Sequence, residues 1–340
     1  MERCPPQSEP ENPLSGPDLR SLHLRLDDNR DQAHTCILQV HDRLDAHPGV
    51  SAAVLDDDMR KDSNARRAMM AESDITILCL PDDAARESAA LADELGARVI
   101  DASSAHRTAN DWTYGFAELV PDAADKIAAA RQISNPGCYP TGFLALARPL
   151  VDAGLIGTDA KLVVSAISGY SGGGKSLIGR HESGEMGAHS AYAVAMSHKH
   201  IPEMVSYTGL ETKPIFMPSI GAFYAGMLVH LPLHAAQLSK AVTAADIYDV
   251  LAAHYDGAAF VRMGSARAGD PETASLYLDA AALVGQNHME LFVFGRRAGR
   301  RCLSVGLDLR MWKKGIRNNM WVGRLRLRWR RMRGVSRSLI

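Results

Sequence analysis

Residues 134–142 place a cysteine where a nucleophile is expected. Cys138 follows Pro136 and Gly137, which favour a tight turn because proline fixes φ at about −65° and glycine tolerates positive φ. The apolar run that follows predicts a helix, which starts at Thr141 or in the turn itself. The unpaired N–H groups and the positive dipole end of such a helix favour a thiolate over a thiol. The alternative is an inert buried cysteine, which is common for free thiols.

Two histidines later in the chain have the chemistry of acid–base catalysis. His198 and His200 stand at i and i+2, and Glu203 follows them. An imidazole held by a carboxylate is suited to general acid–base catalysis at neutral pH. We expect His198 to be this group and His200 to contact the substrate. A metal site is disfavoured, because no third and fourth ligand stand at a matching spacing.

A glycine-rich segment ends in a cation at Lys175. Gly172 and Gly173 lie within it, and the composition predicts a loop of exposed N–H groups that suits a phosphate. The spacing does not match the GxxxxGK[ST] template of phosphate-binding loops. A flexible surface loop is the alternative interpretation.

Alternating strands and helices precede the Cys138 turn. Strands are predicted at 21–26, 50–55, 75–80 and 98–101, and helices at 36–44, 60–71 and 84–95. This order predicts an α/β fold with a parallel sheet, whose ligands bind beyond the carboxyl ends of the strands. Pro81, Ser103, Ser104 and Arg107 all follow such ends. A helix cap for each serine and a solvated charge for Arg107 are the alternatives.

The second half of the chain has a different pattern. Strands are predicted at 161–167, 215–217, 227–233 and 290–294, and a helix at 241–254. This mixture predicts an α+β domain with a mostly antiparallel sheet. The resulting division is a disordered extension at 1–20, a dinucleotide-binding domain at 21–137, a catalytic domain at 138–295 and a basic segment at 296–340.

Composition excludes several classes of protein. A chain of 340 residues is long enough for two domains, and 46% hydrophobic with 23% charged residues is typical of globular proteins. Five irregularly spaced cysteines favour neither a disulfide framework nor a metal site, so we expect a cytoplasmic protein. No apolar run reaches the roughly 18 residues that span a bilayer, so no membrane partner is expected.

The last thirty residues are strongly basic. Residues 311–340 contain ten Lys or Arg and no acidic residue, with Trp312, Trp321 and Trp329 among them. Basic runs with interleaved aromatic residues are typical of nucleic-acid binding, which is an alternative function of another class. Basic runs are more often solvated, and we expect no nucleic-acid partner.

Seven motifs together resemble the N-acetyl-gamma-glutamyl-phosphate reductases of arginine biosynthesis, most closely their shorter type. The motifs are LPDDAA at 80–85, IDASSAHR at 100–107, YGFAEL at 114–119, NPGCYPT at 135–141, GYSGGGK at 169–175, HKHIPE at 198–203 and MELFV at 289–293. The resemblance implies a two-domain architecture like that of glyceraldehyde-3-phosphate dehydrogenase. It also implies an NADPH-dependent reductase that acts on a small molecule and forms a homodimer or homotetramer.

The resemblance assigns roles to individual residues. Cys138 attacks the acyl phosphate, phosphate leaves, and the thioester accepts hydride to release the semialdehyde, with His198 or His200 handling the proton. Substrate contacts are expected at Arg107, Ser104, Lys175, Tyr192 and Glu203, and cofactor contacts at Pro81, Ser103, Gly172, Gly173 and Arg60. The choice between NADP and NAD stays open. Arg60 and Lys61 suit a 2′-phosphate, whereas Asp56, Asp57 and Asp58 suit a free ribose hydroxyl.

Both ends depart from the family pattern. His34 and Ile37 stand where the family has the two glycines of a Gly-x-x-Gly turn, and residues from Arg296 onward lack its closing glycine- and alanine-rich helix. Out-of-frame translation of a gene of this family would produce such ends. The alternatives are therefore a catalytically impaired family member and an aspartate-semialdehyde-type dehydrogenase, of which the HKHIPE motif disfavours the second.

Overall fold

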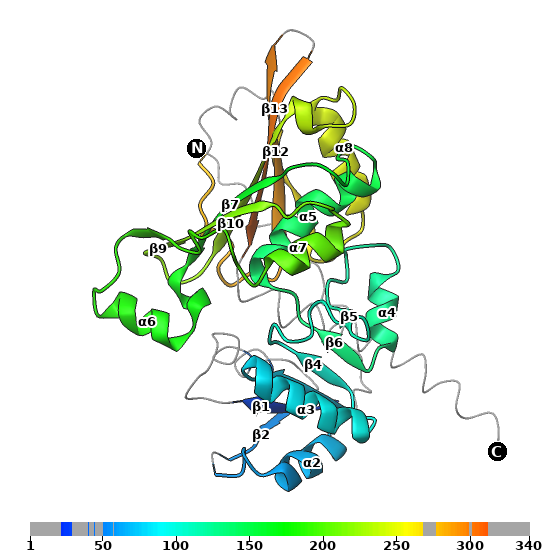
Figure 1. Cartoon of the computed structure of the whole chain (residues 1–340), viewed down its shortest axis with the longest axis vertical. Coiled ribbons are helices and arrows are strands. Elements are labelled where there is room, and N and C mark those ends of the chain that lie inside the picture. Colours follow the sequence, from blue (N-terminus) through cyan, green and yellow to red (C-terminus); the bar gives the residue numbers. More distant parts are fainter. Residues whose placement is uncertain are drawn as a thin grey trace, which may run out of the picture.

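The computed structural model describes residues 22–28, 40, 44, 50–56, 58–267, 277–298 and 301–311. Within them the chain forms two sheets with helices packed on them (Figure 1). The predicted extension at 1–20, the positions of His34 and Ile37, Asp57 and the basic tail after residue 311 lie outside the described residues, as does the predicted helix at 36–44 except for Val40 and Leu44.

The first sheet has six strands that are all paired in parallel, in the order β2-β1-β3-β4-β6-β5. Its strands are β1 (Leu22–Asp28), β2 (Val50–Val54), β3 (Ile75–Cys79), β4 (Val99–Asp101), β5 (Thr113–Tyr114) and β6 (Gln132–Ser134), and the helices between them are α2 (Ser63–Ala71), α3 (Asp82–Glu94) and α4 (Ala123–Ala129). The order turns back at β1, because β2 pairs with one edge of β1 and β3 with the other. This confirms the predicted Rossmann-like sheet, in which ligands bind beyond the carboxyl ends at such a reversal.

The second sheet has seven strands in the order β11-β12-β13-β10-β7-β9-β8. They are β7 (Val163–Gly169), β8 (His189–Ala191), β9 (Ile215–Gly221), β10 (Met227–His234), β11 (Val261–Arg267), β12 (Met289–Ala298) and β13 (Arg301–Met311). The pairs β7–β9 and β11–β12 are parallel and the other four pairs are antiparallel. The prediction of a mostly antiparallel sheet is confirmed.

Helix α5 (Cys138–Asp152) lies at the centre of the hydrophobic core and is in contact with α7 (Ile201–Thr208), α8 (Ala244–His254) and β10. Phe143, Leu144, Leu146 and Leu150 on α5 have no exposed surface. Each such side chain contributes about 1.5–3 kcal/mol to folding by its burial. The start of α5 is therefore held firmly by the core.

The second sheet extends beyond the boundary predicted at residue 295. Strand β12 continues to Ala298, and β13 lies between β12 and β10. Residues 301–311 therefore pair with the adjacent strand β12 and also with β10, which lies far earlier in the chain. Local pattern alone does not detect the pairing with so distant a strand.

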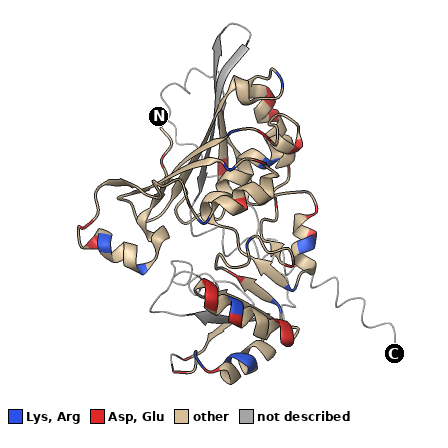
Figure 2. Cartoon of the chain, viewed as in Figure 1, with Lys and Arg blue, Asp and Glu red and all other residues tan. Residues whose placement is uncertain are grey.

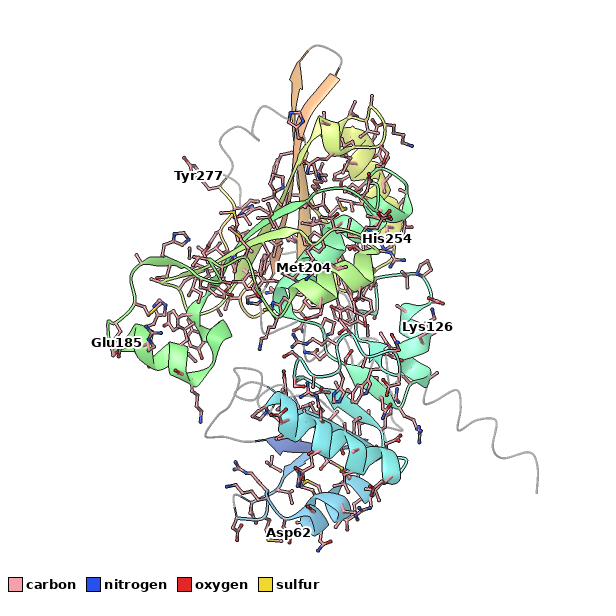
Figure 3. All side chains as sticks on the ribbon, viewed as in Figure 1. Asp62, Lys126, Glu185, Met204, His254 and Tyr277 are labelled. Carbon is pink, nitrogen blue, oxygen red and sulfur yellow. The ribbon has the colours of Figure 1, made fainter. Side chains whose placement is uncertain are left out.

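Charged side chains of both signs are mixed on α3, α4 and α6 (Lys175–Glu182) (Figure 2). This mixture does not favour a polyanion as a partner of these helices. Figure 3 labels side chains of the interior and of the surface. Met204 of α7 has no exposed surface, whereas Glu185, in the segment that follows α6, is exposed. No helix among the described residues combines the length and the apolar character that crossing a bilayer requires.

Candidate active site

Cys138 is the first residue of α5, and it is 6% exposed. The preceding strand β6 ends at Ser134, and Gly137 is the N-cap residue. Thr141 closes the turn, because its N–H and its hydroxyl both donate to the Gly137 carbonyl oxygen, at 3.0 and 2.7 Å. The thiol therefore lies at the end of the helix that favours an anion.

The predicted reason for Gly137 is wrong. Its φ is −64°, an angle that any residue adopts, so positive φ is not what requires glycine here. A Cβ at this position would lie 2.7 Å from Oε1 of Glu203, 2.9 Å from Cδ2 of His200 and 3.0 Å from Nη1 of Arg107. Glycine is required because three side chains pack directly against the backbone.

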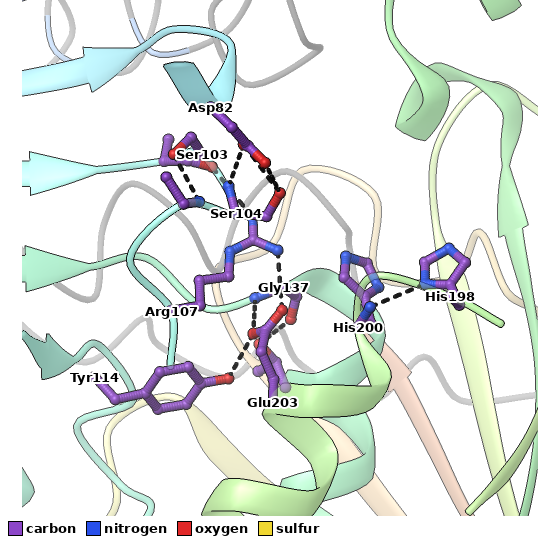
Figure 4. A network of polar contacts seen from close by, with 12 residues as sticks. Asp82, Ser103, Ser104, Arg107, Tyr114, Gly137, His198, His200 and Glu203 are labelled. Atoms are coloured by element: carbon purple, nitrogen blue, oxygen red, sulfur yellow. Dashed lines mark hydrogen bonds and ion pairs between the residues drawn. The ribbon is translucent and has the colours of Figure 1, made fainter. Parts of the chain in front are cut away.

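The two predicted histidines lie together at the start of α7. His200 is the N-cap residue of this helix, and its N–H donates to Nδ1 of His198 at 3.1 Å. The two rings are 4.6 Å apart, with Tyr192 and Phe216 5.7 and 5.3 Å from the His198 ring. Figure 4 shows His200 between the Gly137 turn and His198.

Tyr192 lies near Cys138, where its hydroxyl is next to that of Tyr139. The Tyr139 hydroxyl lies 3.0 Å from Oγ of Ser168 and 3.1 Å from the Ser219 carbonyl oxygen, and it forms a hydrogen bond with Tyr192. Burial raises the pKa of Tyr192 and the nearby Cys138 raises it further, although the Tyr139 hydrogen bond opposes this. The Tyr192 phenol therefore remains protonated beside the nucleophile.

Glu203 and Arg107 form an ion pair beneath the Cys138 turn (Figure 4). Arg107 Nη1 donates to Glu203 Oε1 at 3.0 Å, and the Tyr114 hydroxyl and the Gly137 N–H donate to Oε2 at 3.0 and 2.8 Å. Burial raises the pKa of Tyr114 well above its ordinary value and the carboxylate of Glu203 raises it further, so the phenol stays a donor. The expected contact of Glu203 with a histidine is replaced by these three donors.

Ser104 binds Asp82 at the start of α3. Its N–H donates to Oδ1 at 3.0 Å, and its hydroxyl lies 2.8 Å from Oδ2. Burial alone would raise the pKa of Asp82, but the Ser104 hydrogen bonds and the charges of Lys199 and Arg86 lower it overall. Lys199, which lies between the two histidines in the sequence, is thus close enough to the start of α3 to act on Asp82.

Ser103 binds Asp101, a buried carboxylate at the end of β4. Its N–H and its hydroxyl donate to Asp101 at 2.8 and 2.7 Å, and Asp101 also binds Nδ1 of His106 at 2.7 Å. The carboxylate thus shapes the turn that leads from β4 to Arg107. In this structure both predicted serines have protein partners.

The glycine-rich segment is not the open loop that its composition predicts. Residues Tyr170–Gly173 form a 3₁₀ helix, and α6 starts at Lys175. The N–H groups of Tyr170 and Ser171 donate to the carbonyl oxygens of Phe223 and Tyr224. Lys175, the first residue of α6, is exposed, and α6 projects away from the two sheets in Figure 1. The phosphate-binding role of this segment stays a prediction.

Four residues around Cys138 were not predicted as site residues. Tyr114 and Lys199 belong to motifs quoted above, so their positions in those motifs are the signal that marks them. Gly137 is marked by the side chains that pack on it. Asn135 is 3% exposed, and its amide nitrogen has no hydrogen-bond partner among the described residues, which makes it a candidate donor to a ligand.

The described residues fit a dinucleotide at the reversal of the first sheet. The carboxyl ends of β1 and β3 flank this point, and Pro81, the N-cap residue of α3, lies two residues after the end of β3. Arg60 lies in the turn after β2, where its Nε donates to the Leu55 carbonyl oxygen at 3.5 Å. The ends of β1, β2 and β3 are the places where such a sheet holds a dinucleotide.

Comparisons with known proteins match both halves of the chain. Residues 40–127 match the family model of the semialdehyde dehydrogenase NAD binding domain, and residues 138–307 match that of the semialdehyde dehydrogenase dimerisation domain. The chain is 39% identical over 282 residues to the N-acetyl-gamma-glutamyl-phosphate reductase 2 of Nostoc sp., which covers 81% of this chain and 88% of the relative. It is 43% identical over 262 residues to the N-acetyl-gamma-glutamyl-phosphate reductase of Burkholderia ambifaria, which covers 76% and 82%.

The fold is similar to that of a solved structure of aspartate semialdehyde dehydrogenase II, complexed with ASA, from Vibrio cholerae. The TM-score is 0.65, and the alignment covers 91% of this chain and 99% of the other. The sequence identity is 14%, so the likeness concerns the fold alone.

Proposed function

Because the chain belongs to the N-acetyl-gamma-glutamyl-phosphate reductases, we propose that it reduces N-acetyl-gamma-glutamyl phosphate to the semialdehyde and phosphate, in arginine biosynthesis. The observation that carries the proposal is the position of Cys138, at the first residue of a buried helix beside two histidines. The aspartyl phosphate alternative is not favoured, because its support is a likeness of fold at 14% identity.

The residues of the site divide the reaction into two steps. The Cys138 thiolate attacks the acyl carbon, so that a C–S bond forms while the C–O bond to phosphate breaks. A nicotinamide, when bound, would supply the hydride for reduction of the thioester. A protonated histidine would give its proton to the carbonyl oxygen as the C–H bond forms, and it would take the same proton back as the C–S bond breaks, which releases the aldehyde and the Cys138 thiolate. Arg107 donors that face away from Glu203 bind the departing phosphate or a substrate carboxylate.

The geometry favours His200 as the acid–base group, opposite to the assignment expected from the sequence. Its ring lies against Gly137, next to the nucleophile, whereas His198 lies behind it with Tyr192 and Phe216. Glutamine substitution separates the roles. His200→Gln lowers kcat at a nearly unchanged KM, and His198→Gln mainly raises KM.

We assign NADP as the cofactor on the basis of the turn after β2. The family model of the first domain indicates a nicotinamide dinucleotide. Arg60 and Lys61 lie in this turn, where a 2′-phosphate would meet them, and Arg60 is anchored by the Leu55 carbonyl oxygen. Arg60→Ala raises the KM for NADPH more than the KM for NADH.

The second domain matches a dimerisation domain, and the outer face of its sheet supports a homodimer. Paired residues of β7 and β9 share this face, including Val163 with Ile215 and Ser165 with Met217. Ile215 and Met217 are 49% and 51% exposed. An apolar sheet face with this exposure is typical of an interface with a second copy.

The test is phosphate-dependent oxidation of N-acetyl-glutamate semialdehyde with NADP⁺, compared with aspartate semialdehyde. We expect turnover of the acetylated substrate and a loss of about 1000-fold or more in kcat for Cys138→Ser. Cys79→Ala is the matched control, because Cys79 is the other described free cysteine and is buried in the first sheet. Absence of turnover in the unaltered chain would refute the proposal and favour the impaired family member.

A further inference from the structure

Glu203 is buried near the start of α7, with hydrogen bonds to three separate parts of the chain. Its side chain is 1% exposed. Oε1 accepts from Arg107, which follows β4, and Oε2 accepts from Tyr114 of β5 and from the N–H of Gly137. Both carboxylate oxygens are thus bound by the protein itself, as Figure 4 shows.

This carboxylate connects the nucleophile to the acid–base group. Gly137 immediately precedes Cys138, and His200 caps the helix whose first turn carries Glu203. Oε1 of Glu203 and Cδ2 of His200 both lie within 3 Å of the position that a Gly137 Cβ would take, at 2.7 and 2.9 Å. The hydrogen bond from the Gly137 N–H therefore holds the Cys138 turn and the histidine at a fixed separation.

Arg107 compensates the negative charge of this carboxylate. A carboxylate close to a thiolate disfavours it, whereas a guanidinium favours it. Arg107 is 5% exposed and is fixed on both sides, since its Nη2 donates to the Ala102 carbonyl oxygen at 3.2 Å and its own carbonyl oxygen accepts from Tyr207 at 2.7 Å. A buried ion pair of this kind contributes little net stability, because the charges lose their hydration. Its contribution to the site is therefore the geometry that it fixes.

We propose that Glu203 is a positioning residue that holds the Cys138 turn against His200, and that it is not a substrate contact. This replaces the substrate-binding role predicted for it from the sequence. The inference rests on the proposed function only for the identity of the nucleophile. Among the described residues, the charged and titratable groups near Gly137 and Cys138 include Arg107, Tyr139, Tyr192, His200 and Glu203.

The test compares Glu203→Gln, Glu203→Asp and a matched control, Glu211→Gln. Glu211 is exposed and accepts from the Thr158 hydroxyl at 2.8 Å, away from the catalytic groups. Two readouts are measured for each variant. One is kcat and KM with the acetylated semialdehyde, and the other is the pH dependence of Cys138 alkylation by iodoacetamide, which requires no substrate.

Glu203→Gln is expected to lower kcat about 100-fold with little change in KM, because a displacement of about 1 Å at a reacting group has this effect. The alkylation profile shifts to lower pH by about one unit, because Arg107 is no longer balanced by a carboxylate. Glu203→Asp retains the charge, but its side chain is one methylene shorter and does not reach all three donors, Arg107, Tyr114 and the Gly137 N–H. It is therefore expected to lower kcat while the pH dependence of Cys138 alkylation remains that of the unaltered chain. Glu211→Gln is expected to change neither kcat nor the alkylation profile.

A rise in KM with unchanged kcat and unchanged alkylation, in either Glu203 variant, would make Glu203 a substrate contact and overturn the proposal. Unchanged values of all three quantities would also overturn it. If Glu203→Gln does not fold, Glu203→Asp and Tyr114→Phe test the proposal instead. A lower kcat at an unchanged KM in these variants supports the positioning role of Glu203. If the unaltered chain lacks reductase activity, the proposed function fails, and the alkylation profiles of the variants still decide the role of Glu203.

Discussion

Replacing Gly137 by alanine tests whether the packing around the Cys138 turn is as tight as the structure indicates. The backbone angles at Gly137, φ −64° and ψ 148°, are available to alanine, so no backbone strain arises. The added methyl group would lie 2.7 Å from Glu203 Oε1, 2.9 Å from His200 Cδ2 and 3.0 Å from Arg107 Nη1. All three side chains are buried, so the turn itself must move away from them.

Two opposing terms set the size of the effect. Overpacking a buried site costs about 1–3 kcal/mol. The alanine also restricts the unfolded chain, which contributes about 0.4–1 kcal/mol in the favourable direction. The difference is a net loss of about 1–2 kcal/mol in the free energy of unfolding, and Tm falls by about 2–8 °C. Displacement of Cys138 by about 1 Å would lower kcat about 100-fold.

The assay is thermal unfolding followed by circular dichroism, together with kcat for the semialdehyde oxidation. Gly179→Ala is the matched control, because Gly179 lies within α6 and a Cβ there has no neighbour within 4 Å. This control gains stability, by about 0.5–1 kcal/mol, from the higher helix propensity of alanine. A Gly137→Ala variant with the kcat and Tm of the unaltered chain would refute the packing argument.

Three further expectations follow from other parts of the chain. Ser104→Ala removes a hydrogen bond that lowers the pKa of Asp82 below 3.8 in the folded state. The stability that this bond contributes is therefore present above pH 3.8 and is lost as the pH falls through the folded pKa. Urea unfolding at pH 7 and pH 3 checks that the loss in unfolding free energy caused by the substitution is smaller at pH 3. Met217→Lys introduces a charge on the exposed sheet face and is expected to yield monomers in sedimentation velocity, whereas an unchanged mass would contradict the proposed interface. NADPH is expected to bind roughly ten- to ten-thousandfold more weakly than to a chain that has glycine at positions 34 and 37. The reason is that His34 and Ile37 stand where the glycine turn would make one or two charge-assisted hydrogen bonds to the pyrophosphate, of about 1.5–3 kcal/mol each. Glycine at both positions should tighten binding in a fluorescence titration, and micromolar or tighter binding by the unaltered chain would contradict this.

Local sequence patterns were sufficient for the elements that fold by periodicity. The alternation around Ile75–Cys79 and Asp82–Glu94 predicted the parallel sheet, because a run buried on both faces followed by an alanine-rich amphipathic segment is typical of a strand and its crossover helix. The helix at Cys138 was likewise predicted from neighbouring residues, whereas the tight turn predicted at Pro136 and Gly137 is wrong, because Gly137 is an extended N-cap residue with φ −64° and ψ 148°.

Contacts between distant residues were beyond such patterns. Arg107 and Glu203 are 96 positions apart, and nothing in either neighbourhood indicates that they meet. The glycine-rich segment was predicted to be a loop with exposed N–H groups. Instead it forms a 3₁₀ helix, and the N–H groups of Tyr170 and Ser171 donate to the carbonyl oxygens of residues 223 and 224. The missing information in both cases is the tertiary pairing.

The central position of β13 determines when the second domain is complete during synthesis. Strand β13 is the last described element, yet it lies between β12 and β10 in the middle of the sheet. Until the ribosome has released it, the edges of β10 and β12 present unpaired N–H and C=O groups that other chains can bind. Pairing over so long a sequence separation is also slow. We therefore expect the nascent domain to pass through an aggregation-prone stage that lasts until β13, the last strand among the described residues, has paired.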